Sequence, residues 1–110
     1  MSAESKLLFK RFLETEKDLF PKKTQEFIDQ RKEAAHETII KDNVYEGLMI
    51  EYGLYYDNLL PILSSEQQEW LFELDEISHQ IHYVVSHLGY TIGFLDSLQL
   101  YRDYIDRKNI

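Results

Sequence analysis

Hydrophobic residues recur at steps of three and four along most of the chain, which is the spacing of one face of an α-helix. The first predicted helix covers residues 6–20 and stops at Pro21, where the missing backbone N–H disfavours continuation. A second helix is expected over residues 24–41, with Thr24 as its N-cap, and a third over residues 43–61, which Pro61 closes. Because no strand-like alternation occurs, the pattern predicts an all-α bundle of four or five helices.

The longest regular pattern begins after Ser64. Ser64 and Gln67 stand at the spacing of a capping box, in which each side chain satisfies the other residue's backbone N–H. Apolar side chains then follow at helical spacing as far as Ile105. This region is either one long amphipathic helix or two helices divided near Gly89, and the sequence leaves both readings open.

Charge divides the chain into two parts. The chain has 110 residues and a formal net charge of −8. Acids and bases balance over residues 1–43, no Lys or Arg occurs between Asp42 and Arg102, and all eight tyrosines follow residue 43. We expect a single helical domain over residues 1–110, with a mixed-charge helical arm (1–43) and an acidic, tyrosine-rich body (44–110).

This composition excludes several classes of function. The net negative charge argues against direct binding of nucleic acid, whose phosphates attract Lys and Arg. The absence of cysteine excludes a disulfide scaffold and a thiolate zinc site. No catalytic triad order or phosphate-binding glycine loop is present, so we expect a protein that is not an enzyme and takes no cofactor.

Residues 77–95 form the longest stretch without Asp, Glu, Lys or Arg. The stretch contains three histidines and is flanked by acids, whereas a spanning helix needs about 20 mainly apolar residues and basic anchors. We therefore expect no membrane partner and a cytoplasmic location.

An acidic stripe gives the strongest candidate for a binding surface. Its carboxylates recur at helical spacing with no basic residue to pair with them, so they form either a solvated face or a surface that meets a basic groove on a partner. If the partner is a protein that normally binds nucleic acid, these carboxylates would imitate the phosphates of that ligand and occupy its binding site. The candidate contact residues are Glu66, Glu69, Glu73, Asp75, Glu76 and Tyr83.

Two alternatives use other residues. Glu33 with His36, and Glu76 with His79, form two Glu-x-x-His units of the kind that hold two metal ions in carboxylate helical bundles. Gly89, Gly93 and Ser97 form a stripe of small residues at steps of four, which lets a second helix approach closely, from the same chain or as the seam of a homodimer.

Three segments carry a resemblance to known proteins: Leu54-Tyr-Tyr-Asp-Asn-Leu-Leu, Leu63-Ser-Ser-Glu-Gln-Gln-Glu and residues 89–100. They resemble uncharacterised small helical proteins of Gram-positive bacteria and their mobile elements. The resemblance covers residues 54–100 and its motifs are packing motifs, so it implies no catalytic residue. It implies a bacterial, plasmid or phage context, and a location in the host cytoplasm if the gene is carried by a phage. Many phage products of this size act as inhibitors of host defence nucleases, anti-CRISPR proteins among them.

Overall fold

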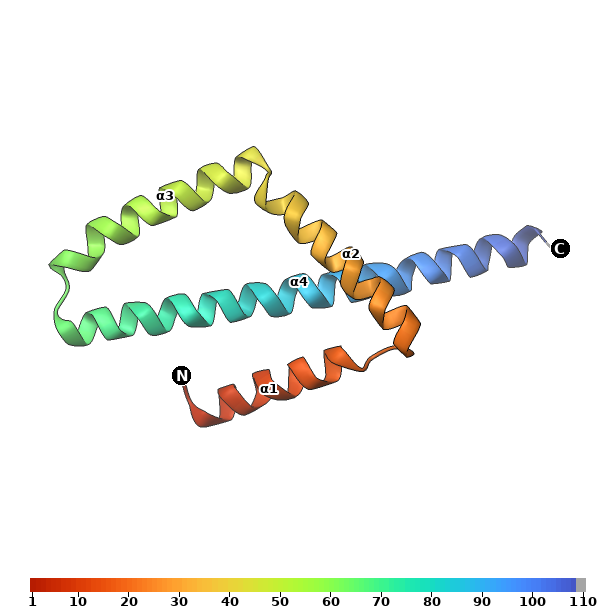
Figure 1. Cartoon of the computed structure of the whole chain (residues 1–110), viewed down its shortest axis with the longest axis horizontal. Coiled ribbons are helices and arrows are strands. Elements are labelled where there is room, and N and C mark those ends of the chain that lie inside the picture. Colours follow the sequence, from red (N-terminus) through yellow and green to blue (C-terminus); the bar gives the residue numbers. More distant parts are fainter. Residues whose placement is uncertain (109–110) are drawn as a thin grey trace. The chain divides into compact units, whose positions relative to one another are not determined.

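A computed structural model describes residues 1–108, and the fold class predicted from the sequence is confirmed over that part of the chain. The described residues form four α-helices and one short 3₁₀ helix, with no strand among them, as Figure 1 shows. In chain order these elements are α1 (Ala3–Lys17), α2 (Lys22–Ile40), α3 (Asn43–Leu59), η1 (Leu60–Ile62) and α4 (Ser65–Lys108).

The last helix, α4, is continuous over 44 residues. The question that the sequence left open is thereby answered, because the helix runs through Gly89 without a break. Its start is the predicted capping box: the Ser64 hydroxyl accepts the Gln67 N–H at 3.2 Å, and the Gln67 side chain accepts the Ser64 N–H at 3.0 Å.

The second helix begins earlier than the sequence pattern predicts. Pro21 occupies the N-cap position and α2 starts at Lys22, so Thr24 lies in the first turn and does not cap the helix. Gln25 takes over part of the capping role, because its side-chain oxygen accepts the Phe20 N–H at 3.1 Å. Proline's restricted φ already suits a helix start, which explains the earlier beginning.

Asp42, at the start of the third helix, caps α3 by accepting the backbone N–H groups of Val44 and Tyr45 at 2.9 and 3.1 Å. α3 ends at Leu59, two residues before the predicted end at residue 61, and Pro61 lies within η1. The turn that follows is tied to α4 by Gln68, whose side-chain amide donates to the carbonyls of Leu60 and Leu63.

The chain divides into two structural units, residues 1–78 and residues from 79 onward, so the division falls inside α4. The boundary at residue 43 between the mixed-charge arm and the acidic body does not coincide with this division. The charge pattern depends on side chains at the surface, whereas the division depends on which residues contact one another. In the first unit Ile28 is fully buried, and Glu16 of α1 forms an ion pair with Lys32 of α2 that is largely removed from solvent. The described part of the second unit is the remainder of α4.

Candidate interaction surface

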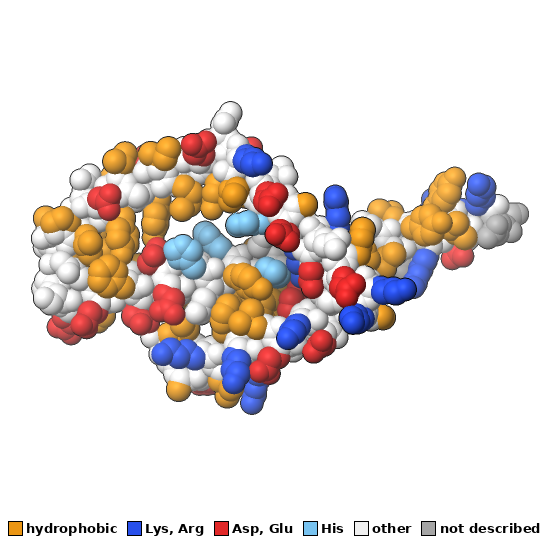
Figure 2. Space-filling model, in the orientation of Figure 1, with side chains coloured by type: hydrophobic (Ala, Val, Ile, Leu, Met, Phe, Trp, Pro, Cys, Tyr) orange, Lys and Arg blue, Asp and Glu red, His pale blue; other side chains and the backbone are white. Residues whose placement is uncertain are grey.

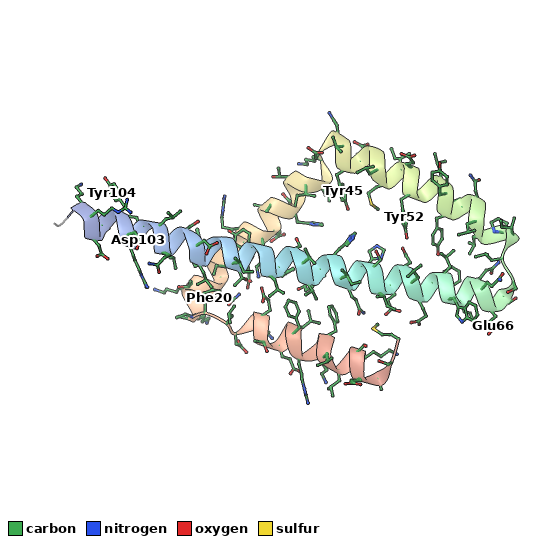
Figure 3. The ribbon with its side chains drawn as sticks, turned by 180° about the vertical axis from the view of Figure 1, so that it is seen from behind. Phe20, Tyr45, Tyr52, Glu66, Asp103 and Tyr104 are labelled. Atoms are coloured by element: carbon green, nitrogen blue, oxygen red, sulfur yellow. The ribbon has the colours of Figure 1, made fainter. Side chains whose placement is uncertain are left out.

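The third helix and the beginning of α4 bear most of the residues that the sequence singled out. Tyr52 points from α3 toward α4, as Figure 3 shows, and its hydroxyl donates to the Asp75 carboxylate at 2.5 Å. This hydrogen bond, followed by desolvation, raises the pKa of Tyr52 above its usual value of 10.0. The ring of Tyr56 stacks on that of Tyr52 with centroids 6.2 Å apart. Asp75 therefore makes a contact within the chain, between α4 and α3.

A second acid of the predicted stripe is also engaged within the first unit. The Met1 ammonium group forms an ion pair with the Glu73 carboxylate at 2.5 Å. The hydrogen bond from that amine, and then its charge, lowers the pKa of Glu73 below its usual value. Two of the five predicted acids thus have partners in the same chain, which helical spacing alone did not indicate.

The remaining three acids, Glu66, Glu69 and Glu76, are exposed. Within the described residues they make no hydrogen bond or ion pair with another side chain. Glu66 lies at the turn between η1 and α4 in Figure 3, in the first turn of the helix, where the helix dipole favours negative charge. These three carboxylates are available to a partner.

Tyr83, which the sequence grouped with these acids, belongs to the second unit. Its ring stacks on the imidazole of His87 with centroids 3.9 Å apart. This contact holds the tyrosine ring against its own helix at i, i+4 spacing, and the side chain remains 39% exposed.

The small-residue stripe of α4 stays open. No atom lies within 4 Å of the position that a Cβ would occupy at Gly89 or at Gly93. The Ser97 hydroxyl donates to the Gly93 carbonyl of its own helix at 2.9 Å. Among the described residues, a methyl group at either glycine would therefore meet nothing beyond the neighbouring backbone of its own helix.

The two Glu-x-x-His units do not build a metal centre in the structure. Within residues 1–108 no group of three or more His, Asp or Glu side chains is placed so that it can hold a metal ion. Glu33, His36, Glu76 and His79 therefore give the two-metal alternative no geometric support.

A surface that the sequence analysis did not single out lies on α3. No residue of this helix is buried, although ten of its 17 residues are hydrophobic. A shallow hollow on the side away from Tyr52 is lined by Gly47, Ile50, Glu51, Leu54, Tyr55 and Asn58. Figure 2 shows hydrophobic and acidic side chains along this edge of α3. The sequence does contain a signal for this surface, because apolar residues occur on every side of this helix rather than in one stripe.

Comparisons with known proteins add no family to this description: no family model matches the chain, and neither a curated protein nor a solved structure does. Among the described helices, none combines the length and the apolar character needed to traverse a lipid bilayer.

Proposed function

We propose that the chain is a non-enzymatic, acidic helical module that binds a basic surface on another protein. The observation that carries this proposal is the composition of the exposed surface over α3 and the start of α4. That surface presents large apolar side chains beside carboxylates, and no Lys or Arg occurs between Asp42 and Arg102. An apolar patch bordered by one sign of charge suits a partner of the opposite sign.

The three available acids supply the electrostatic part. Glu66, Glu69 and Glu76 lie on α4 at steps of three and seven residues. Glu66 and Glu69 occupy neighbouring positions on one helix face, about 5–6 Å apart, which is near the spacing of phosphates along a nucleic-acid strand. Glu76 follows two turns later, roughly 10 Å further along the same helix. The narrower form of the proposal follows: the partner handles nucleic acid, and the module inhibits it by occupying its basic groove. A phage or mobile-element inhibitor, such as an anti-CRISPR protein, acts in this way.

A capture experiment with matched variants tests the proposal. The tagged chain and its Glu66→Gln/Glu69→Gln/Glu76→Gln variant are each incubated with bacterial lysate at low and moderate salt, and the captured proteins are identified by mass spectrometry. The control is Glu4→Gln/Glu14→Gln/Glu26→Gln, because it removes the same charge from exposed positions of α1 and α2.

We expect the wild type and the control to retain a nucleic-acid-binding protein that the α4 variant loses. The affinity for that purified protein should fall as salt rises, and the slope should flatten in the α4 variant. Capture of the same proteins by all three forms would contradict the proposal, because the α4 acids would then contribute nothing specific.

A further inference from the structure

The third helix has the composition of a buried helix and the exposure of a surface helix. Ten of its residues are hydrophobic, two are glycine and five are polar. A helix that is apolar all round is normally buried on all sides. Its side toward α4 carries Tyr52 and Tyr56, whereas its opposite side has nothing packed on it: Val44, Leu54 and Tyr55 are 60–70% exposed.

We call this opposite side the α3 outer face and define it by the hollow around Gly47 and its lining residues Ile50, Glu51, Leu54, Tyr55 and Asn58. The hollow exists because Gly47 has no side chain, and nothing lies within 4 Å of the position that its Cβ would occupy. Two turns further along the same face, Leu54 projects into solvent with 60% of its area exposed.

The exposed area is what a small stable interface requires. Four large apolar side chains on or beside this face (Val44, Ile50, Leu54 and Tyr55) are 59–70% exposed. Each offers on the order of 100 Å², so together they offer roughly 400 Å². Gly47, Glu51 and Asn58 bring the face near the roughly 600 Å² that each partner contributes at the lower end of stable interfaces.

We propose that a second copy of this chain covers the α3 outer face, with the two α3 helices antiparallel about a two-fold axis between Ile50 and Glu51. A two-fold interface must fit itself, so each feature meets its complement in the other copy. About this axis, Leu54 of one copy lies against Gly47 of the other, and the hollow at each glycine receives the leucine of the partner. Ile50 of each copy lies against Glu51 of the other, with one such pair on each side of the axis.

Substitution of Glu51 distinguishes self-association through this face from the binding of a basic partner. In the antiparallel arrangement each Glu51 carboxylate lies against the apolar Ile50 side chain of the other copy, where it loses water without gaining a positive partner. Neutralising them strengthens self-association. If a basic partner bound the same face, neutralising Glu51 would remove an attraction and weaken the binding. The dimer uses part of the surface that the proposed function invokes, but the substitution Glu51→Gln has opposite effects in the two cases, so the failure of one proposal is distinguishable from the failure of the other.

The molar mass of the full chain in solution, measured by light scattering and sedimentation from about 1 µM to about 200 µM, tests this arrangement. We expect the wild type to reach twice the mass of one chain. Leu54→Glu should raise the dissociation constant by about tenfold or more, and Glu51→Gln should lower it by about twofold.

Two control substitutions on α4 test whether the dimer forms specifically through α3. Leu100→Glu introduces the same charge at a leucine of α4 that is 71% exposed, and Gly93→Leu blocks the alternative seam of small residues on α4. Both should leave the dimer unchanged. Circular dichroism checks that each variant keeps its helix content, which the exposure of Leu54 favours.

Four results would overturn the proposal. They are a mass of one chain at every concentration, a mass of three or more chains, loss of the dimer in Gly93→Leu with retention in Leu54→Glu, and weaker association of Glu51→Gln.

Discussion

The ion pair between Glu16 and Lys32 joins α1 to α2 beside Ile28, in the best-buried part of the first unit. The side chains of Glu16 and Lys32 keep only 11% and 10% of their exposed area. Charges taken out of water are tolerated when they are paired, and the loss of one partner leaves the other charge uncompensated.

We therefore expect Lys32→Met to lower the free energy of unfolding by about 3 kcal/mol, measured by urea denaturation. Adding Glu16→Gln to that variant should recover part of the loss, because the remaining carboxylate is then neutral. An unchanged unfolding midpoint in Lys32→Met would show that the pair contributes nothing to stability.

A second residue-scale prediction concerns the proton of Tyr52. A pKa that is raised in the folded state means that the folded chain holds the proton more tightly than the unfolded chain. The resulting stabilisation is fully present below pH 10.0 and is lost as the pH rises through the folded pKa. Asp75→Asn should shift part of the tyrosinate absorbance titration to lower pH, and Tyr52→Phe should remove that part. Glu4→Gln, the charge control, should leave the titration unchanged.

Individual residues were the least predictable level from the sequence. Helical spacing correctly grouped the acids of α4, but it could not show that Glu73 meets the Met1 amine or that Asp75 meets Tyr52. Such contacts depend on how helices far apart in sequence approach each other, and a periodic pattern within one helix does not contain that information.

At the scale of elements, the glycines of α4 offer a test. Gly89 and Gly93 lie inside the helix, and nothing occupies the space that a methyl group would take at either position. Alanine forms helix more readily than glycine by about 1 kcal/mol at such positions. Gly89→Ala and Gly93→Ala should therefore each raise the thermal midpoint of unfolding. A lower midpoint would mean that another surface needs a glycine there.

Elements were predicted well where local chemistry decides them. The capping box of Ser64 and Gln67 placed the start of α4, and the apolar repeat predicted helix beyond it, because both signals are local. Whether the helix breaks at Gly89 was left open by the sequence, and the structure shows that it does not. The start of α2 was predicted two residues late, because Thr24 is a favoured capping residue, whereas Pro21 and Gln25 provide the start in the structure. The side chain of Gln25, inside the helix, accepts the backbone N–H of Phe20, which lies before the helix.

At the scale of the whole molecule, self-association and folding are linked. If α3 is covered by a second copy, the dimer stabilises the folded state by mass action. The unfolding midpoint should then rise with protein concentration between about 1 µM and about 100 µM, and Leu54→Glu should abolish that dependence. A midpoint that is independent of concentration in the wild type would contradict the link.

The segregation of charge also fixes how the protein responds to common reagents. Trypsin cleaves after Lys and Arg, so it releases α3, η1 and most of α4 as one unbroken peptide that ends at Arg102. Amine-directed dyes and crosslinkers attach at the chain's lysines, which occur up to Lys41 and again only at Lys108. The α3 outer face carries no amine and passes through such labelling chemically unaltered, so that a fully labelled protein still presents its native contact surface.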